Sequence, residues 1–407
     1  MTGNGTGVGP RREDSMAAAN LVTAELDEPI RHKVWLHDDT LRDGEQTVGV
    51  RFSVQQKVEI AGLLLDAGMP SITLGFPVVA DEEREAIREI LKLEHEGRDL
   101  WCLSRATQKD IDATVECGVR NIALFVPSSD IHLQHKLRMT EDQAFERITS
   151  AVRYAVGLGL RVRAGCEDGT RTPTPRLVRF IKGIVDAGAH MTGAADTVGI
   201  LTPLSCYRWV REMVAASGGV PFGVHFHDDL GMATANTITA AVAGASVLMG
   251  SFAGLGERAG NVCLEEVAVA LRVKYGVDMG IDLPKLTRAA RRIAEIAGMP
   301  VPPCKPILGA KVFSHEAGIH VHGVTAEPST YEPFPPELVG RRHEIHYGKH
   351  SGLHSMRHLA RQIGIEVSEQ VMDEALDALK RHTYEHGAPT PEKAGEILLA
   401  VATSRGS

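Results

Sequence analysis

The sequence lacks the features that mark secreted, membrane-spanning and nucleic-acid-binding proteins. Its six cysteines show no C-x-x-C spacing, which argues against a disulfide framework or a zinc knuckle and favours reduced thiols in a cytosolic protein. No apolar run reaches the roughly 18 residues that a membrane span requires. Acidic residues (52) outnumber Lys and Arg (44), so the net charge is -8 and no basic surface for nucleic acid is expected.

Length and composition instead fit an ordinary globular protein. The chain has 407 residues, of which 43% are hydrophobic and 24% charged, enough for one large α/β domain with an appendage. The first part of the chain is rich in Gly, Ala and Thr and contains no apolar core segment. We therefore expect a disordered N-terminal extension over residues 1–30 and no secretory signal peptide.

An amphipathic helix that ends at a glycine, followed by a short apolar strand, recurs along the chain. Examples surround Gly68, Gly118, Gly159, Gly188 and Gly244. Glycine suits the left-handed position that ends a helix. Together with the other apolar runs, the pattern predicts strands near residues 33–37, 70–75, 99–104, 120–126, 160–166, 189–195, 221–227 and 246–252.

Eight parallel strand–helix units over residues 31–290 predict an α/β fold, a (β/α)8 TIM barrel. A doubly wound open sheet is the alternative, and it is disfavoured because no G-x-G-x-x-G follows the first strand. Beyond the barrel, a Pro-rich linker at 299–309 and a polar, His-rich stretch predict a first small C-terminal subdomain at 291–350. Helical periodicity then predicts a second subdomain at 351–407.

Polar residues that suit metal chemistry follow the first and seventh predicted strands, at the barrel end where active sites form. His225 and His227 are two apart on a strand, so both can face one ion. With the acidic loop after the first strand they predict a carboxylate–imidazole site, which suits Mn, Mg, Fe or Zn without selecting one. In the Gly-rich loop at 254–261, Asn261 either caps the next helix or, like Glu257, reaches the metal and substrate.

Four motifs then carry a resemblance to a known family. They are D-T-L-R-D-G-E-Q, H-x-H-D-D-L-G-M-A-T-A-N, G-L-G-E-R-A-G-N and H-E-A-G-I-H, in this order within residues 33–355. Together they resemble the DRE-TIM metallolyase superfamily, and within it homocitrate synthases, with 2-isopropylmalate synthases more distant. The resemblance implies a TIM barrel, a divalent metal, and Claisen condensation of acetyl-CoA with a 2-oxo acid followed by thioester hydrolysis.

The resemblance also implies roles for individual residues of this chain. The expected metal ligands are Asp43, His225, His227 and Asn261. The expected substrate-binding residues are Arg42, Gln46, Arg163 and Thr197. The expected catalytic residues are Arg42, Glu167, His320 and Tyr331. In relatives the His–Tyr pair enters the barrel of the neighbouring subunit, which implies a domain-swapped homodimer.

Structural alternatives stay open for three of these residues. Arg163 can instead be an ion-paired residue at a strand end, Tyr331 a loop anchor, and Thr197 the cap of the next helix. A decayed, non-catalytic relative is disfavoured because the implied catalytic set is complete. An acyl-CoA carbon–carbon lyase is disfavoured because no Cys-bearing glycine loop of the kind found in those lyases occurs between residues 254 and 300.

The chain departs from the family pattern at several positions. Asp228 stands where relatives carry Asn, the second predicted strand leads into L-G-F-P without a Glu, and Arg105 follows the third strand where lysine-pathway relatives carry His. 2-Oxoglutarate is the first expected substrate. The alternative, favoured by Arg105 and Asp228, is a phosphonate or phosphinate analogue as substrate. The protein would then be a 2-phosphonomethylmalate or phosphinomethylmalate synthase. Because the chain stops at 407, leucine feedback is not expected.

Overall fold

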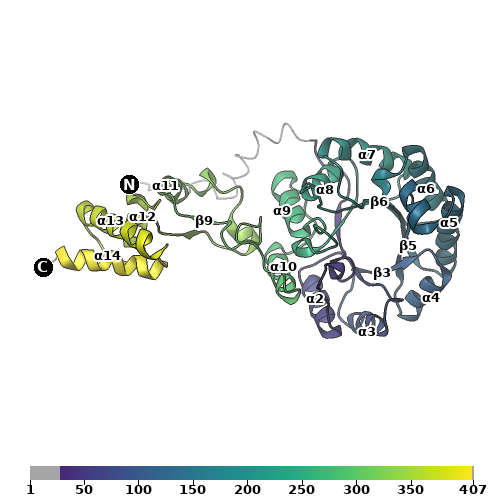
Figure 1. Cartoon of the computed structure of the whole chain (residues 1–407), viewed down its shortest axis with the longest axis horizontal. Coiled ribbons are helices and arrows are strands. Elements are labelled where there is room, and N and C mark those ends of the chain that lie inside the picture. The colour runs from purple at the N-terminus through teal and green to yellow at the C-terminus, as the bar shows by residue number, and fades with distance from the viewer. Residues whose placement is uncertain (1–27, 406–407) are drawn as a thin grey trace, which may run out of the picture. The chain divides into compact units, whose positions relative to one another are not determined.

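Eight parallel strands close into a barrel in this computed structural model, which describes residues 28–405 (Figure 1). The strands are β1 (Trp35–Asp38), β2 (Ser71–Gly75), β3 (Asp99–Arg105), β4 (Asn121–Pro127), β5 (Arg161–Glu167), β6 (Met191–Asp196), β7 (Phe222–Phe226) and β8 (Val247–Gly250). β1 pairs with both β2 and β8, which closes the sheet. The predicted TIM barrel is therefore confirmed, and each predicted strand overlaps an observed one. Most of the predicted N-terminal extension lies outside the described residues.

Helices alternate with the strands and lie around the outside of the barrel (Figure 1). They are α2 (Val54–Asp66), α3 (Asp81–Ile90), α4 (Gln108–Glu116), α5 (Glu141–Gly157), α6 (Thr174–Asp186), α7 (Pro203–Ala216), α8 (Ala233–Val242), α9 (Leu264–Tyr275) and α10 (Leu283–Ile296). Capping boxes start α2, α5 and α7, at Ser53, Thr140 and Thr202. The predicted glycine stops occur where expected: Gly68 and Gly244 have φ of 86° and 114°, which a residue with a Cβ rarely adopts.

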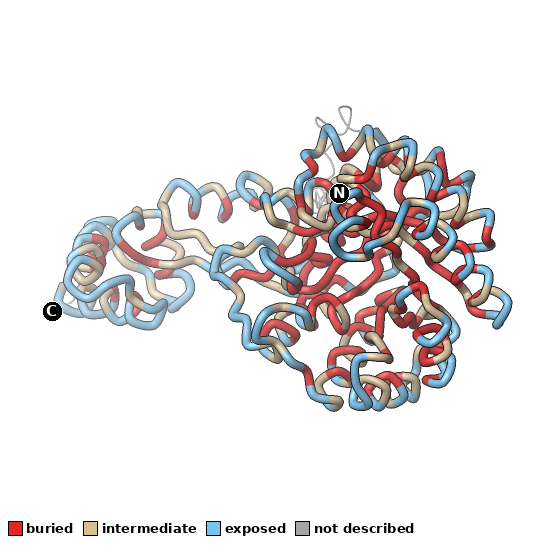
Figure 2. Tube along the Cα trace, turned by 45° about the vertical axis from the view of Figure 1, so that its right-hand side comes forward, coloured by how far each residue is buried: buried red, intermediate tan, exposed pale blue. Residues whose placement is uncertain are grey.

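The interior of the barrel is filled by large side chains from the early parts of the strands. Trp101, Met191, Val247 and Met249 form one buried cluster, with Trp35 packed against it. Buried residues follow the strands and the inner faces of the helices, while exposed residues lie outside (Figure 2). Because the early strand positions are filled, open space is left toward the carboxyl ends of the strands.

The chain divides into two compact units. Among the described residues, the barrel unit holds 28–301 and 306–308, and the second unit holds 302–305 and 309–405. The second unit contains the short parallel strands β9 (Ser314–His315) and β10 (Glu344–Ile345), and helices α11 (Gly318–Ala326), α12 (Leu353–Ile363), α13 (Glu369–His386) and α14 (Pro391–Arg405). Its core includes Tyr347, Met356, Leu359, Leu379 and Leu398. The predicted small helical C-terminal region is confirmed, while the predicted limits at 290 and 350 stay predictions.

Within residues 28–405, no helix combines the length and the apolar character that crossing a membrane would need. All six cysteines are free thiols, and Cys304 is the exposed one.

One buried carboxyl group in the barrel wall makes stability depend on pH. Asp38 ends β1, is fully buried, and accepts hydrogen bonds from the backbone N–H and the hydroxyl of Thr40 at 3.2 and 2.6 Å. Burial raises the pKa of Asp38 to about 8. Between about pH 4 and 8 the folded chain keeps a proton that the unfolded chain releases, so the free energy of unfolding falls as pH rises, by at most about 1.4 kcal/mol per pH unit.

We predict that Asp38→Asn, which mimics the protonated carboxyl group, raises the thermal midpoint relative to wild type by an amount that grows from about pH 5 to pH 8. At about pH 4, where both folded and unfolded Asp38 hold a proton, the two proteins should melt together. Melting curves followed by dye fluorescence across this pH range test the prediction, with the exposed Asp186→Asn as control. A difference that is constant with pH would contradict the raised pKa.

Candidate active site

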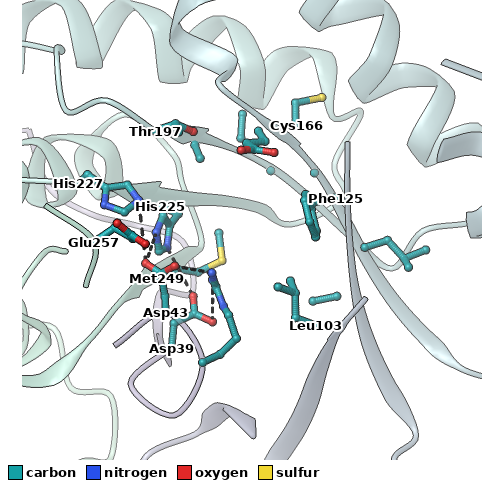
Figure 3. A pocket seen from close by; sticks show the side chains of 18 of the residues that line it. Asp39, Asp43, Leu103, Phe125, Cys166, Thr197, His225, His227, Met249 and Glu257 are labelled. Atoms are coloured by element: carbon teal, nitrogen blue, oxygen red, sulfur yellow. Dashed lines mark hydrogen bonds and ion pairs between the residues drawn. The ribbon is translucent and has the colours of Figure 1, made fainter. Parts of the chain in front are cut away.

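A cavity of about 440 Å³ opens at the carboxyl ends of the barrel strands (Figure 3). Polar residues, several of them predicted from the sequence, line it together with an apolar wall. The polar lining comprises Asp39, Arg42, Asp43, Gln46, Lys136, Arg163, Glu167, Thr197, His225, His227, Glu257 and Arg258, and the apolar lining includes Leu103, Ala123, Phe125, Ala195 and Met249. Active sites of TIM barrels are built at this end of the strands.

Asp43, His225 and His227 converge on one point of this cavity, as Figure 3 shows. Each is buried and offers one ligand atom, and these atoms lie within 4.8 Å of one another. The Nε2 atoms of His225 and His227 lie 3.5 and 3.9 Å from the same carboxylate oxygen of Asp43. The Nδ1 atom of His227 is buried without a hydrogen-bond partner among the described residues. One oxygen and two nitrogen donors in this arrangement fit a divalent transition metal.

The protonation of this cluster follows from its charges. Burial alone would lower the pKa of His225, but its contacts with Asp39 and Asp43 outweigh burial and raise the pKa to about 9. Burial and the charge of His225 together lower the pKa of His227 to about 4. Near neutral pH, one imidazolium therefore lies between two carboxylates. A metal ion would take over that positive charge, because a histidine must be deprotonated to coordinate.

Arg42 and Asn261 hold the carboxylate of Asp43 from two sides. Arg42 donates to Oδ1 of Asp43 at 2.6 Å and lies 3.3 Å from Asp39, while its Nε is buried without a partner among the described residues. Asn261 donates through Nδ2 to Oδ2 of Asp43 at 2.6 Å and to the carbonyl of Leu255 at 3.0 Å. The loop asparagine thus contacts a candidate metal ligand. It is not the cap of α9, because the residue at that position is Cys263.

Glu167, the last residue of β5, and Thr197, which follows β6, line another part of the cavity. Oε1 of Glu167 accepts from Lys136 at 2.6 Å and lies 3.7 Å from His132, whereas its Oε2 is buried without a partner among the described residues. Lys136 and His132 are delivered by a short π-helix, η2 (His132–Leu137), an element often found at functional sites. Thr197 does not cap α7, which begins after Thr202.

Arg163 is a buried cation with no direct ion pair among residues 28–405. Its side chain lies against Trp101, with the guanidinium carbon 5.5 Å from the centre of the ring, and 7% of the residue is exposed. It forms no ion pair with any residue that the structure describes, and its Nη1 lacks a hydrogen-bond partner there. Burial lowers its pKa to about 10. The alternative of an ion-paired strand-end residue is therefore excluded.

The sequence did not predict the parts played by Asp39 and His37. Asp39 lies 3.5 Å from His225 and 3.3 Å from Arg42, so it shares their charge with Asp43. His37 bonds the hydroxyl groups of Ser71 and Thr73, both at 2.7 Å, and burial followed by the charge of Arg163 lowers its pKa to about 4. The sequence signal that could have identified them is the two-residue alternation along β1, which places His37 and Asp39 on the interior face of the barrel.

Two expected specificity residues do not line the cavity. Arg105 is bound by Asp110 at 2.6 and 3.1 Å and lies over the ring of Phe76. Asp228 accepts the backbone N–H of Ala233, at the start of α8, at 2.8 Å. Neighbouring groups already bind both charges, so the expectation that they select a phosphorus-containing substrate gains no support.

His320 and Tyr331 lie together in the C-terminal unit. His320 belongs to α11, and the centres of the two rings are 4.5 Å apart. Tyr331 is 46% exposed. The residues that line the cavity all belong to the barrel unit, and neither His320 nor Tyr331 is among them.

Comparison with known proteins gives consistent matches along the chain. The HMGL-like family model matches residues 33–293, and the homocitrate synthase post-HMGL domain-like model matches residues 307–387. Homocitrate synthase AksA of Methanopyrus kandleri is 42% identical over 94% of this chain and 95% of its own length. A probable 2-isopropylmalate synthase of Ignicoccus hospitalis is 41% identical over 94% and 96%. Hydroxymethylglutaryl-CoA lyase from Pseudomonas aeruginosa shares the fold, with a TM-score of 0.61 and 24% identity over 66% of this chain and 94% of that one.

We predict that metal binding releases about one proton per ion at about pH 7.5, because His225 must lose its proton to coordinate. The release should fall toward zero above about pH 9, where His225 is already neutral. Calorimetric titration of chelator-treated protein with Mn²⁺ in two buffers of different ionisation enthalpy measures it.

His225→Ala should abolish this binding while leaving the fold intact by circular dichroism, whereas His190→Ala, which alters a histidine outside the cavity lining, should bind Mn²⁺ like wild type. Undiminished catalytic turnover after exhaustive chelation would refute a metal requirement.

Proposed function

Because the chain belongs to the HMGL-like family, as its motifs predicted, we propose that it is an acyltransferase that condenses acetyl-CoA with a 2-oxo diacid and then hydrolyses the thioester. The observation that carries the choice of a diacid is Arg163, a buried guanidinium inside the cavity that forms no direct ion pair among the described residues. A buried charge without a partner is costly, so the missing partner is assigned to the substrate. 2-Oxoglutarate is the first substrate to test, followed by oxaloacetate.

Asp43, His225 and His227 would hold the divalent ion, with Asn261 beside Asp43. A divalent ion bound there supplies Lewis acidity toward the keto oxygen. Arg42 keeps its Nε free of protein partners among the described residues and lines the cavity, so it can donate to the oxygen on which negative charge develops. Thr197 lines the same cavity and would bind a substrate carboxylate.

Two groups are candidates for the base that removes a proton from the acetyl methyl group. Glu167 lines the cavity, and its Oε2 has no partner among the described residues, while Lys136 neutralises its charge through Oε1. The alternative is His320 working with Tyr331, supplied by a second subunit. An imidazole or a carboxylate placed at the reacting carbon is the usual form of such a base.

Other reactions lack support from the cavity. The phosphorus-containing substrates were favoured by Arg105 and Asp228, which are bound elsewhere. The likeness to hydroxymethylglutaryl-CoA lyases shows the fold alone. The described site loop at 254–261 contains no cysteine of the kind expected in those lyases.

We predict that 2-oxoglutarate or oxaloacetate supports faster release of CoA than 2-oxoisovalerate does, and that Arg163→Ala weakens diacid binding by about 2 to 5 kcal/mol, the scale for breaking a desolvated charge pair. Thiol release from acetyl-CoA with a panel of oxo acids, phosphonopyruvate included, measures both effects. Arg161→Ala is the matched control, since Arg161 is on the same strand and over the same Trp101 ring but is paired with Asp99 at 2.6 Å. Faster turnover of 2-oxoisovalerate than of every diacid would show the assignment to be wrong.

We also propose that the active unit is a domain-swapped homodimer. Exposed aliphatic residues occupy the loops that follow five strands at the cavity end: Val48 (88% exposed), Val79 (69%), Ile131 (51%), Ile200 (45%) and Leu230 (61%). A rim of this kind favours an apolar partner over water. We assign the C-terminal unit of a second copy as the partner that covers this rim. That unit offers an apolar side chain beside His320, because Ile319 is 77% exposed.

We predict that inactive His227→Ala and inactive His320→Ala proteins regain part of the wild-type turnover when they are mixed and exchange subunits. A hybrid dimer with shared sites contains one site with an intact His227 and an intact His320. The mixture is assayed by thiol release after subunit exchange is verified with two affinity tags. Verified hybrids without activity would count against shared sites.

A further inference from the structure

Asp168 adopts a backbone conformation that residues other than glycine rarely adopt. It follows β5 directly, with φ of 59° and ψ of 37°, in the left-handed region. This conformation costs an L-residue free energy, although Asp and Asn tolerate it better than most. Strained residues of this kind concentrate at functional sites, where surrounding contacts hold them in place.

The carboxylate of Asp168 is held by contacts that fix this turn. The residue is fully buried, Arg171 donates to both of its oxygens at 2.8 and 3.1 Å, and the hydroxyl of Ser129 donates to one of them in a short hydrogen bond. The next residue, Gly169, has no room for a side chain, because a Cβ there would lie 2.8 Å from the Cβ of Ala194. The side chain of Asp168 therefore anchors a turn that packs tightly against β6.

The anchored turn points the backbone N–H of Asp168 at Thr197. The N–H donates to Oγ1 of Thr197 at 2.9 Å. A threonine hydroxyl has one hydrogen, so an oxygen that accepts from a backbone N–H keeps its own hydrogen to donate. No acceptor for that hydrogen is found among the described residues, and Thr197 lines the cavity (Figure 3).

A second contact fixes the backbone of Thr197 from the other side. Arg258 donates to the carbonyl of Thr197 at 2.5 Å and, through Nε and Nη2, to both carboxylate oxygens of Asp229 at 2.8 and 2.9 Å. With its carbonyl and its hydroxyl oxygen both engaged, the Thr197 side chain keeps its hydroxyl hydrogen to donate.

We propose that Asp168 is a positioning residue that orients the Thr197 hydroxyl as a hydrogen-bond donor to a carboxylate of the 2-oxo acid. The proposal rests on the proposed function, in which Thr197 binds that carboxylate. Asp168 does not touch the substrate: its carboxylate holds the turn, and its N–H sets the direction of the Thr197 hydrogen bond. Substrates that offer a carboxylate at this place are therefore favoured over those that offer a donor group there.

A double-mutant cycle tests the proposal. The Kd of 2-oxoglutarate is measured by calorimetry in the presence of Mn²⁺, with KM and kcat from thiol release, for wild type, Thr197→Val, Asp168→Ala and the double variant. Oxaloacetate replaces 2-oxoglutarate if it is the faster substrate. Thr197→Val and Asp168→Ala should each raise Kd by about 10- to 100-fold, the loss of one hydrogen bond to a charged group.

Three readouts separate positioning from a general structural role. In the Thr197→Val background, Asp168→Ala should change Kd no further, because the hydroxyl it orients is gone. Asp168→Asn should restore most of the affinity, because Asn tolerates the left-handed conformation and can accept from Ser129. The KM for acetyl-CoA should stay near that of wild type. If Asp168→Ala does not fold, Arg171→Ala, which loosens the anchored carboxylate, takes its place in the cycle.

The outcomes distinguish this proposal from the one on which it rests. If Thr197→Val leaves Kd unchanged, the assigned substrate contact and the positioning role both fall, while the proposed reaction is still decided by the oxo-acid panel. If Thr197→Val raises Kd but Asp168→Ala does not, or if its effect persists undiminished in the Thr197→Val background, the positioning role is overturned and the proposed reaction stands.

Discussion

Two carboxylates, Asp39 and Asp43, are buried where the first and last strands of the barrel meet, and the rest of the site is arranged around their charge. Burying them uncompensated would be prohibitively costly. Arg42 neutralises both from the same loop, and His225, on β7, lies 3.5 Å from each of them. Residues from β1 and β7 are thereby drawn to one point, which also brings two imidazoles and one carboxylate into metal-binding geometry. The contacts that compensate the buried charges are therefore the same contacts that assemble the site.

The loop after β8 completes this arrangement and explains its glycines. Thr47, beyond Asp43 in the first loop, bonds both the N–H and the carbonyl of Gly256, at 2.7 and 3.2 Å. A Cβ on Gly256 would lie 2.6 Å from the amide nitrogen of Asn261, and one on Gly260 would overlap the carbonyl of Gly254. Glycine is required at these positions because the loop folds tightly enough to press Asn261 against Asp43.

Short-range sequence patterns predicted the features of the fold that depend on neighbouring residues in the chain. Helices that stop at glycine and short apolar runs located every strand, and two-residue alternation placed His225 and His227 on one face. The same alternation could have placed Asp39 on the interior face, but not beside His225, which is distant in the sequence. The role of Asp168 depends on a left-handed turn that the pattern does not predict. Arg105 suggested a substrate contact because its nearby partner was overlooked. Its partner Asp110 is five residues away, and a charge satisfied so close by is unavailable to a substrate.

The charge of the cavity itself constrains the substrate. Asp39 and Asp43 are balanced by Arg42 and protonated His225, and Glu167 by Lys136, which leaves the single charge of Arg163. The exposed Glu257 and Arg258 at the mouth have opposite signs. Exchange of one His225 proton for a divalent ion adds one further positive charge, so the loaded cavity carries an excess of two. A dicarboxylate cancels that excess, whereas a monocarboxylate with an apolar tail leaves one buried positive charge unpaired. Because an unpaired buried charge costs free energy, the dicarboxylate should bind more tightly than the monocarboxylate.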